Sequence, residues 1–172
     1  MECQRCTDLC VSRRGIVLPD LPEWGRPCRL LALGEAPGSD EDLQGRGFVG
    51  RAGRTLHRLL EEHGLHRGAH YGCANIVRCR PPGNRRPTAA EIGNCLSHLA
   101  GTLERARPEA VLLVGGTAAS VFCGAGSLAE HIAHLHSQGN RLSPGCCPPD
   151  LRGVLEGDSA PRVFAMPHTS PL

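Results

Sequence analysis

The densest group of chemically capable side chains lies in residues 34–50, GEAPGSDEDLQGRGFVG. Four carboxylates fall within eight residues, at Glu35, Asp40, Glu41 and Asp42. Carboxylates at this density repel one another unless hydrogen-bond donors, a cation or a reaction uses their charge. The glycines among them let a ligand approach the backbone closely. The pattern is typical either of a solvated acidic loop or of a loop that serves catalysis.

Alternating strands and helices are predicted around this stretch. Apolar runs indicate strands at residues 29–33, 74–77, 110–114 and 162–166, and helical patterns are clearest at residues 52–63 and 88–106. We therefore predict an α/β fold, an α/β/α sandwich around a mostly parallel four-stranded sheet, in one domain spanning residues 1–172. Ligands of such sheets bind beyond the carboxyl ends of the strands, where Gly34, Asn75 and His168 fall. Residues 143–159 are predicted to form a surface loop.

Ten cysteines favour metal binding over disulfides, because the chain has neither a secretion signal nor an apolar run long enough to span a membrane. We therefore expect a cytoplasmic protein with reduced thiols. Cys3 and Cys6 have a metal-ligand spacing, and Cys79 and Cys95 bracket a loop rich in proline, glycine and arginine. On spacing alone, a zinc ion and an iron–sulfur cluster both fit these four residues.

Positive charge is concentrated in residues 43–90, although the net charge of the chain is only +2. This segment holds nine arginines and two acidic residues, so it predicts a basic face that binds phosphates. Ordinary solvated helix surface is the alternative for Arg54, Arg58 and Arg67.

Four stretches, in order, resemble the motifs of the family 4 uracil-DNA glycosylases, the iron–sulfur branch of the uracil-DNA glycosylase superfamily. Residues 34–53 resemble the first motif, and residues 75–85, NIVRCRPPGNR, the second. Residues 112–119 resemble the third strand and the start of its helix, and residues 168–170, His-Thr-Ser, stand where the family has His-Pro-Ser. The resemblance extends over residues 3–172.

The resemblance implies a DNA glycosylase that hydrolyses the N-glycosidic bond of uracil in DNA and leaves an abasic site. Cleavage of that bond leaves negative charge on the departing base, and the nucleotide must first be flipped out of the stack. By resemblance, Phe48 stacks on the base in a pocket that includes Gly34, and Asn75 reads the base edge. Glu41 holds the attacking water, with Glu35 as the second choice. His168 hydrogen-bonds the oxygen that becomes anionic.

The resemblance also assigns a cofactor and a partner. It implies a 4Fe-4S cluster on Cys3, Cys6, Cys79 and Cys95, and phosphate contacts from Asn84, Arg85, Arg86 and Ser170. The partner is DNA, single- or double-stranded, and a monomer is the default expectation. Because the sequence contains no lysine, we expect no lyase step through a lysine Schiff base.

Because of three departures from the family pattern, the sequence predicts the type of reaction more firmly than the identity of the base. Gly47 replaces a proline before Phe48, and Thr169 replaces the proline after His168. Family members usually continue past the equivalent of Leu172, so we expect the segment that wedges into the minor groove to be short or to lie outside this sequence. A glycosylase for another modified pyrimidine and a non-catalytic iron–sulfur DNA-binding module remain as alternatives.

Overall fold

The structure, a computed structural model, describes residues 3–23 and 28–169. Its centre is a sheet of four parallel strands in the order β2-β1-β3-β4. The strands are β1 (Leu30–Gly34), β2 (Tyr71–Asn75), β3 (Ala110–Val114) and β4 (Arg162–Met166). The predicted α/β class and four-stranded sheet are confirmed, and every strand pair is parallel.

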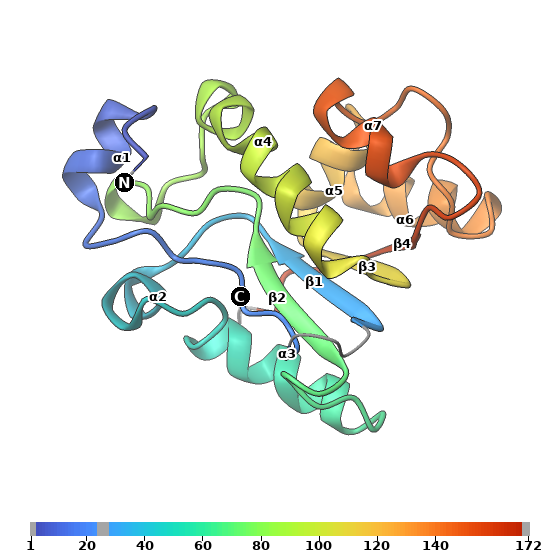
Figure 1. The fold of residues 1–172 in the computed structure, drawn as a ribbon, viewed down its shortest axis with the longest axis horizontal. Coiled ribbons are helices and arrows are strands. Elements are labelled where there is room, and N and C mark those ends of the chain that lie inside the picture. Colours follow the sequence, from blue (N-terminus) through green and yellow to red (C-terminus); the bar gives the residue numbers. More distant parts are fainter. Residues whose placement is uncertain (1–2, 24–27, 170–172) are drawn as a thin grey trace.

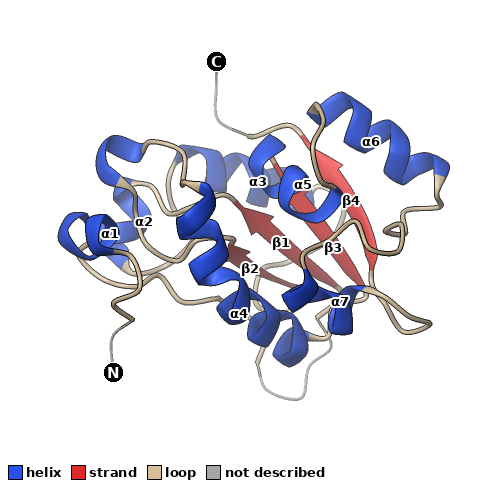
Figure 2. Ribbon diagram, turned by 90° about the horizontal axis from the view of Figure 1, so that it is seen from above, coloured by secondary structure: helices blue, strands red, loops and turns tan. Residues whose placement is uncertain are grey.

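Helices cover both faces of the sheet (Figure 1). One face carries α3 (Arg51–Glu61), and the other carries α4 (Ala89–Ala106) and α5 (Gly116–Cys123). The view from above shows α7 (Pro149–Leu155) against α4, and α6 (Leu128–Ser137) along β4 (Figure 2). Two short helices, α1 (Thr7–Ser12) and α2 (Ser39–Gln44), lie on the side of the sheet where the strands end (Figure 2), and the 3-10 turn η1 (Pro82–Asn84) contacts α1.

Alternation of side chains along the strands divides the interior into two cores. Leu31 and Leu33 of β1 are fully buried in the core beneath α4, α5, α6 and α7. Ala32, between them, points to the opposite face and packs with Leu56 of α3 and Tyr71 of β2. Both faces of β1 are therefore buried, as expected of a central parallel strand.

Both helices that the sequence predicts are present at the expected positions. The expected helix at residues 88–106 is α4, which begins with a capping box in which Thr88 accepts the N–H of Glu91 and Glu91 accepts the N–H of Thr88. The expected helix at residues 52–63 is α3. Among the described residues, no helix is both long and apolar enough to cross a membrane.

Three predicted segments need correction. The strand expected at residues 74–77 is β2, which begins at Tyr71 and ends at Asn75, because its partner β1 ends at Gly34 opposite Asn75. Residues 143–159, expected to be a loop, contain α7, which buries Leu151 and Leu155. The acidic stretch 34–50 is also partly helical, since it contains α2.

Candidate functional site

A cavity of about 680 Å³ opens at the carboxyl end of the sheet. Its walls come from the ends of β1, β2 and β3, from the segments that follow them, and from His168 beyond β4. Nine of the predicted site residues line it together: Gly34, Glu35, Glu41, Phe48, Asn75, Asn84, Arg85, Arg86 and His168. Parallel strands bring these distant positions to one edge because their carboxyl ends coincide.

Phe48 and Asn75 meet over Gly34. A methyl group on Gly34 would lie 2.5 Å from Asn75 Oδ1 and 2.8 Å from Phe48 Cζ. A residue other than glycine would therefore displace both side chains. Phe48 is 9% exposed, so most of its ring is packed against the protein while it still lines the cavity. This pairing of an aromatic ring with a side-chain amide suits the recognition of a flat heterocycle with hydrogen-bonding groups at its edge.

The carboxylate of Glu41 is occupied by backbone donors. Oε1 accepts the N–H groups of Val49 at 3.0 Å and Gly50 at 2.8 Å, and Oε2 accepts the N–H of Gly38 at 3.1 Å. One side chain thus joins the start of α2 to the segment that follows Phe48. Since an ionised carboxylate has about four acceptor positions, little capacity remains for a water molecule.

The other carboxylates of the acidic stretch have different surroundings. Asp42 is buried and accepts the backbone N–H of Arg14 at 2.9 and 3.1 Å. Glu35 and Asp40 line the cavity. Backbone donors therefore take up the charges of Glu41 and Asp42, whereas no backbone donor is described for Glu35 and Asp40.

His168 lies at the mouth of the cavity, two residues beyond β4. Its ring packs on Gly115, where an added methyl group would lie 3.5 Å from both Cβ and Cδ2 of the histidine. Gly115 has φ = +95°, which favours glycine. The next residue, Thr169, donates its hydroxyl hydrogen to the carbonyl oxygen of Ala52 at 2.8 Å. A proline at this position has no such donor, so the threonine ties the His168 segment to α3.

Besides the start of α2, which carries acidic side chains, the N-termini of two further helices face the cavity. Residues 50–53, at the start of α3, and residues 115–117, at the start of α5, line its wall. Both N-cap residues are glycines and offer no side-chain acceptor to the first N–H groups. Helix N-termini carry partial positive charge, so this wall favours anionic groups such as phosphate or a departing anion.

Several arginines of the basic segment bond within the protein. Arg85 makes two hydrogen bonds to the buried Glu91, at 2.7 and 2.9 Å, and these hold the pKa of Glu91 at about 2. Arg80 donates to Asn84 Oδ1 at 2.7 Å. Arg78 donates to α4, including Thr102 Oγ1 at 2.8 Å. These contacts shape the loop that follows β2, and the phosphate contacts of Asn84, Arg85 and Arg86 stay predictions.

The other predicted DNA contacts are Arg86 and Ser170. Arg86 is exposed at the rim of the same cavity. Arg51, in the first turn of α3, is exposed at the rim as well. Ser170, the last predicted contact, lies outside the described residues.

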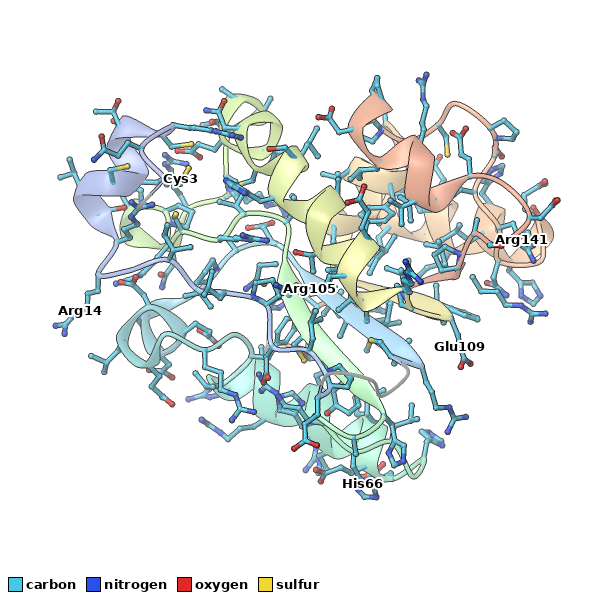
Figure 3. The ribbon with its side chains drawn as sticks, viewed as in Figure 1. Cys3, Arg14, His66, Arg105, Glu109 and Arg141 are labelled. Atoms are coloured by element: carbon cyan, nitrogen blue, oxygen red, sulfur yellow. The ribbon has the colours of Figure 1, made fainter. Side chains whose placement is uncertain are left out.

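The four predicted cluster ligands come from the N-terminal segment, the loop after β2 and α4. Cys3 lies beside α1, at the end of the molecule opposite Arg141 (Figure 3). Burial raises the pKa of the Cys95 thiol, and the neighbouring thiols of Cys79, Cys6 and Cys3 raise it further. Within the described part of the chain, no three metal-binding side chains are close enough to form a metal site.

The chemistry of this donor set nevertheless fits an iron–sulfur cluster. Arg13 Nη1 donates to Cys79 Sγ at 2.9 Å, and Asn94 Nδ2 donates to Cys6 Sγ at 3.4 Å. Donors of this kind stabilise the thiolates that hold such clusters. Arg5 also bonds to α4 through the carbonyl oxygen of Asn94, at 3.0 Å, which docks the N-terminal segment beside Cys95.

Comparison with known proteins agrees with the site. The model of the uracil DNA glycosylase superfamily matches residues 23–172. The chain belongs to this superfamily. The resemblance found in the sequence motifs is thereby confirmed.

Individual relatives point to one branch of the superfamily. The chain is 40% identical over 121 residues to the Type-4 uracil-DNA glycosylase of Thermotoga maritima, covering 70% of this chain and 60% of that protein. It is also 40% identical over 120 residues to the Type-4 enzyme of Archaeoglobus fulgidus, covering 69% and 57%. The chain therefore spans only about three fifths of the length of these curated relatives.

A second layer of residues behind Phe48 was not predicted from the sequence. His57 and Arg67 contact the carbonyl oxygens of Gly47 and Phe48, and Asp20 bonds to Arg67. Arg67 was interpreted as possible solvated helix surface, and no local pattern singles out the other two. Only the fold brings these three positions together.

Proposed function

We propose that this chain is a monofunctional DNA glycosylase that hydrolyses the N-glycosidic bond of uracil in DNA, as the names of its relatives suggest. The observation that carries the proposal is the meeting of the Phe48 ring and the Asn75 amide over Gly34, in a cavity that Glu35 and His168 also line. A flipped pyrimidine needs a flat apolar surface and a donor–acceptor edge, and this corner of the cavity offers both.

In this proposal, Phe48 and Asn75 bind the base. The ring stacks on one face of the pyrimidine. The amide donates from Nδ2 to the O4 atom of uracil and accepts the N3–H at Oδ1, so both hydrogen-bonding groups of that edge are matched. Cytosine presents the reversed pattern, with an amine donor and an unprotonated ring nitrogen, and is therefore rejected.

We assign the attacking water to Glu35 and a positioning role to Glu41. The sequence alone ranked these two in the opposite order. Three backbone N–H groups occupy the carboxylate of Glu41, whereas Glu35 faces the same cavity from the residue after β1. Glu35 would orient the water and stabilise the positive charge that develops on the sugar.

His168 and the two helix N-termini would stabilise the departing base. The ring is supported by Gly115, and its segment is tied to α3 through Thr169. A donor at this place strengthens its hydrogen bond as the uracil oxygen becomes anionic, which lowers the barrier selectively. The starts of α3 and α5 add partial positive charge on the same side of the cavity.

DNA and a 4Fe-4S cluster complete the proposal. The exposed Arg51 and Arg86 at the cavity rim are suited to bind phosphates beside the flipped nucleotide. The cluster would be held by Cys3, Cys6, Cys79 and Cys95 and would fasten the N-terminal segment to the loop after β2 and to α4. A reducing cytoplasm is the compartment in which these thiols stay available.

A panel of oligonucleotides tests the substrate. Single-stranded and duplex DNA, each with one uracil, thymine, hypoxanthine or modified cytosine, is incubated with the protein and then treated with alkali. Strand breakage at uracil alone supports the proposal. Strand breakage only at a modified pyrimidine would identify that base as the substrate in place of uracil. Binding without strand breakage would favour the non-catalytic DNA-binding module.

The Asn75→Asp variant tests the reading of the base edge. An aspartate accepts hydrogen bonds only, so activity on uracil should fall by at least about 100-fold, because a buried polar group of the base loses its partner. Weak breakage at cytosine is expected in its place. Unchanged activity on uracil would show that Asn75 does not read the base.

A further inference from the structure

The backbone at Phe48 is held in an uncommon conformation. Its φ angle is +57°, in the left-handed region that costs a bulky residue on the order of 1 kcal/mol. The preceding residue is Gly47, which adds no stiffness of its own. The surroundings must therefore fix the conformation that turns the ring into the cavity.

Two side chains donate to successive carbonyl groups at this point. His57 Nε2 lies 2.8 Å from the carbonyl oxygen of Phe48, and Arg67 Nη1 lies 3.3 Å from the same atom. Arg67 Nη2 donates to the carbonyl oxygen of Gly47 at 2.6 Å. Both peptide groups that precede Val49 are thus held by side chains that do not line the cavity.

The imidazole of His57 lies between the hydroxyl of Tyr71 and the carbonyl oxygen of Phe48. Tyr71 is fully buried on β2, and its oxygen lies 2.7 Å from His57 Nδ1. Burial raises the pKa of Tyr71 to about 12, so the phenol remains protonated and can donate to Nδ1. Burial lowers the pKa of His57, which favours the neutral ring. The carbonyl oxygen of Phe48 can only accept, so its contact of 2.8 Å with Nε2 places the proton of the ring on that nitrogen. Arg67 Nη1 also lies 2.8 Å from Nε2, which packs the guanidinium against the imidazole.

Asp20 anchors Arg67. Its Oδ2 atom lies 2.8 Å from Nε and 2.7 Å from Nη2 of the arginine, whose side chain is 13% exposed. Asp20 is itself fixed to β2, because its backbone exchanges hydrogen bonds with Cys73 at 2.9 and 2.7 Å. The network therefore connects the sheet to the Phe48 peptide through rigid elements.

From this arrangement we infer that His57, oriented by Tyr71 and backed by Arg67 and Asp20, is a positioning residue that fixes the Phe48 ring for stacking on the flipped base. This inference rests on the proposed function for its consequence in base release. The geometry of the Phe48 peptide, however, is independent of that function. His57 does not line the cavity and acts only through Phe48.

The main experiment is a double-mutant cycle between His57 and Phe48. His57→Leu should lower the single-turnover rate of uracil release by about 10- to 100-fold, as expected when a buried hydrogen bond that orients a binding group is lost. His57→Gln can still donate to Phe48 and accept from Tyr71, so it should stay within about 3-fold of the wild type. In a Phe48→Ala background, His57→Leu should cause no further loss.

Two further variants serve as a control and as a substitute in this experiment. His63→Leu makes the same substitution at an exposed position just beyond α3 and should leave the rate unchanged. Tyr71→Phe removes only the hydroxyl that orients the imidazole, so it serves if His57→Leu does not fold. Its smaller loss, about 3-fold, should also vanish in the Phe48→Ala background.

Crystal structures of the wild type, His57→Leu and His57→Gln provide a readout that needs no activity. Phe48 should leave the left-handed region in His57→Leu and keep it in His57→Gln. If Phe48 keeps its φ angle in His57→Leu, or if the His57 and Phe48 losses multiply independently, the inference is wrong. If the wild type releases no uracil, the proposed function fails, while the comparison of Phe48 conformations still decides whether His57 positions it.

Discussion

Glu41 Oε1 accepts the backbone N–H of Gly50 at 2.8 Å, and this contact links the acidic helix α2 to the residue that caps α3. With the bonds to Val49 and Gly38, the carboxylate stabilises both ends of the segment that presents Phe48. The charge of Glu41 is thereby used to build the pocket.

Replacing Glu41 should therefore reduce stability as well as activity. Glu41→Ala leaves three backbone donors without an acceptor and should lower the free energy of unfolding by about 1–3 kcal/mol, measured by urea denaturation. Asp40→Asn, on the same helix but exposed, is the matched control and should stay within about 0.5 kcal/mol. Full stability in Glu41→Ala, with activity lost, would return the water-holding role to Glu41.

Gly53 is predicted to be irreplaceable although it lies in a helix. A methyl group there would overlap the carbonyl carbon and oxygen of Phe48. Gly53→Ala should cost about 1–3 kcal/mol through this clash, against the helix preference for alanine of about 1 kcal/mol. Gly101→Ala in α4 meets nothing within 4 Å and should stabilise the protein slightly. Equal gains in thermal stability for both variants would contradict the close packing of α3 on Phe48.

Acid should destabilise the loop after β2 through Glu91. Arg85 lowers the pKa of Glu91 from 4.5 to about 2, so the folded state favours the ionised carboxylate. The stabilisation is fully present above pH 4.5 and is lost as the pH falls from 4.5 towards 2. The difference in urea midpoint between the wild type and Glu91→Gln should therefore shrink between pH 6 and pH 3. A constant difference over this range would mean that the ion pair does not contribute.

The sequence predicted the elements with strong periodicity and the positions where strands end. The apolar runs around Leu31 and Leu113 are typical only of buried strands, and the capping box of Thr88 and Glu91 marks the start of α4. The start of β2 was placed too late, because Tyr71 and Gly72 join the sheet through pairing with β1, which no local pattern reveals. Likewise, α7 follows a segment rich in proline and glycine, and its packing on α4 makes it helical.

The sequence predicted which residues line the cavity more completely than what each of them does there. The motifs identified the residues that line the cavity. They did not reveal that the carboxylate of Glu41 is taken up by N–H groups or that Arg85 bonds to Glu91, because both facts depend on distances between separate segments. Roles that depend on hydrogen-bond partners cannot be assigned until the fold brings those partners together.

The cofactor proposal predicts the colour and composition of the protein. Purified under reducing conditions without oxygen, the wild type should be brown and contain about four irons and four sulfides per chain. Cys79→Ser should lose the iron and much of its solubility, because the cluster fastens the N-terminal segment. Cys28→Ser, at a buried position outside the predicted ligand set, is the control for the loss of a core thiol and should keep the iron. A colourless protein with one zinc would instead support a zinc site.

The release of free uracil tests the central claim most directly. The wild type and the His168→Ala variant are mixed in excess with a single-stranded oligonucleotide that contains one uracil, and the free base is quantified by mass spectrometry. The account predicts one uracil per oligonucleotide from the wild type, and a release rate about 10²- to 10³-fold lower for His168→Ala, with DNA binding retained, because this donor acts mainly in the transition state. An intact oligonucleotide after incubation with folded, iron-loaded wild-type protein would contradict it.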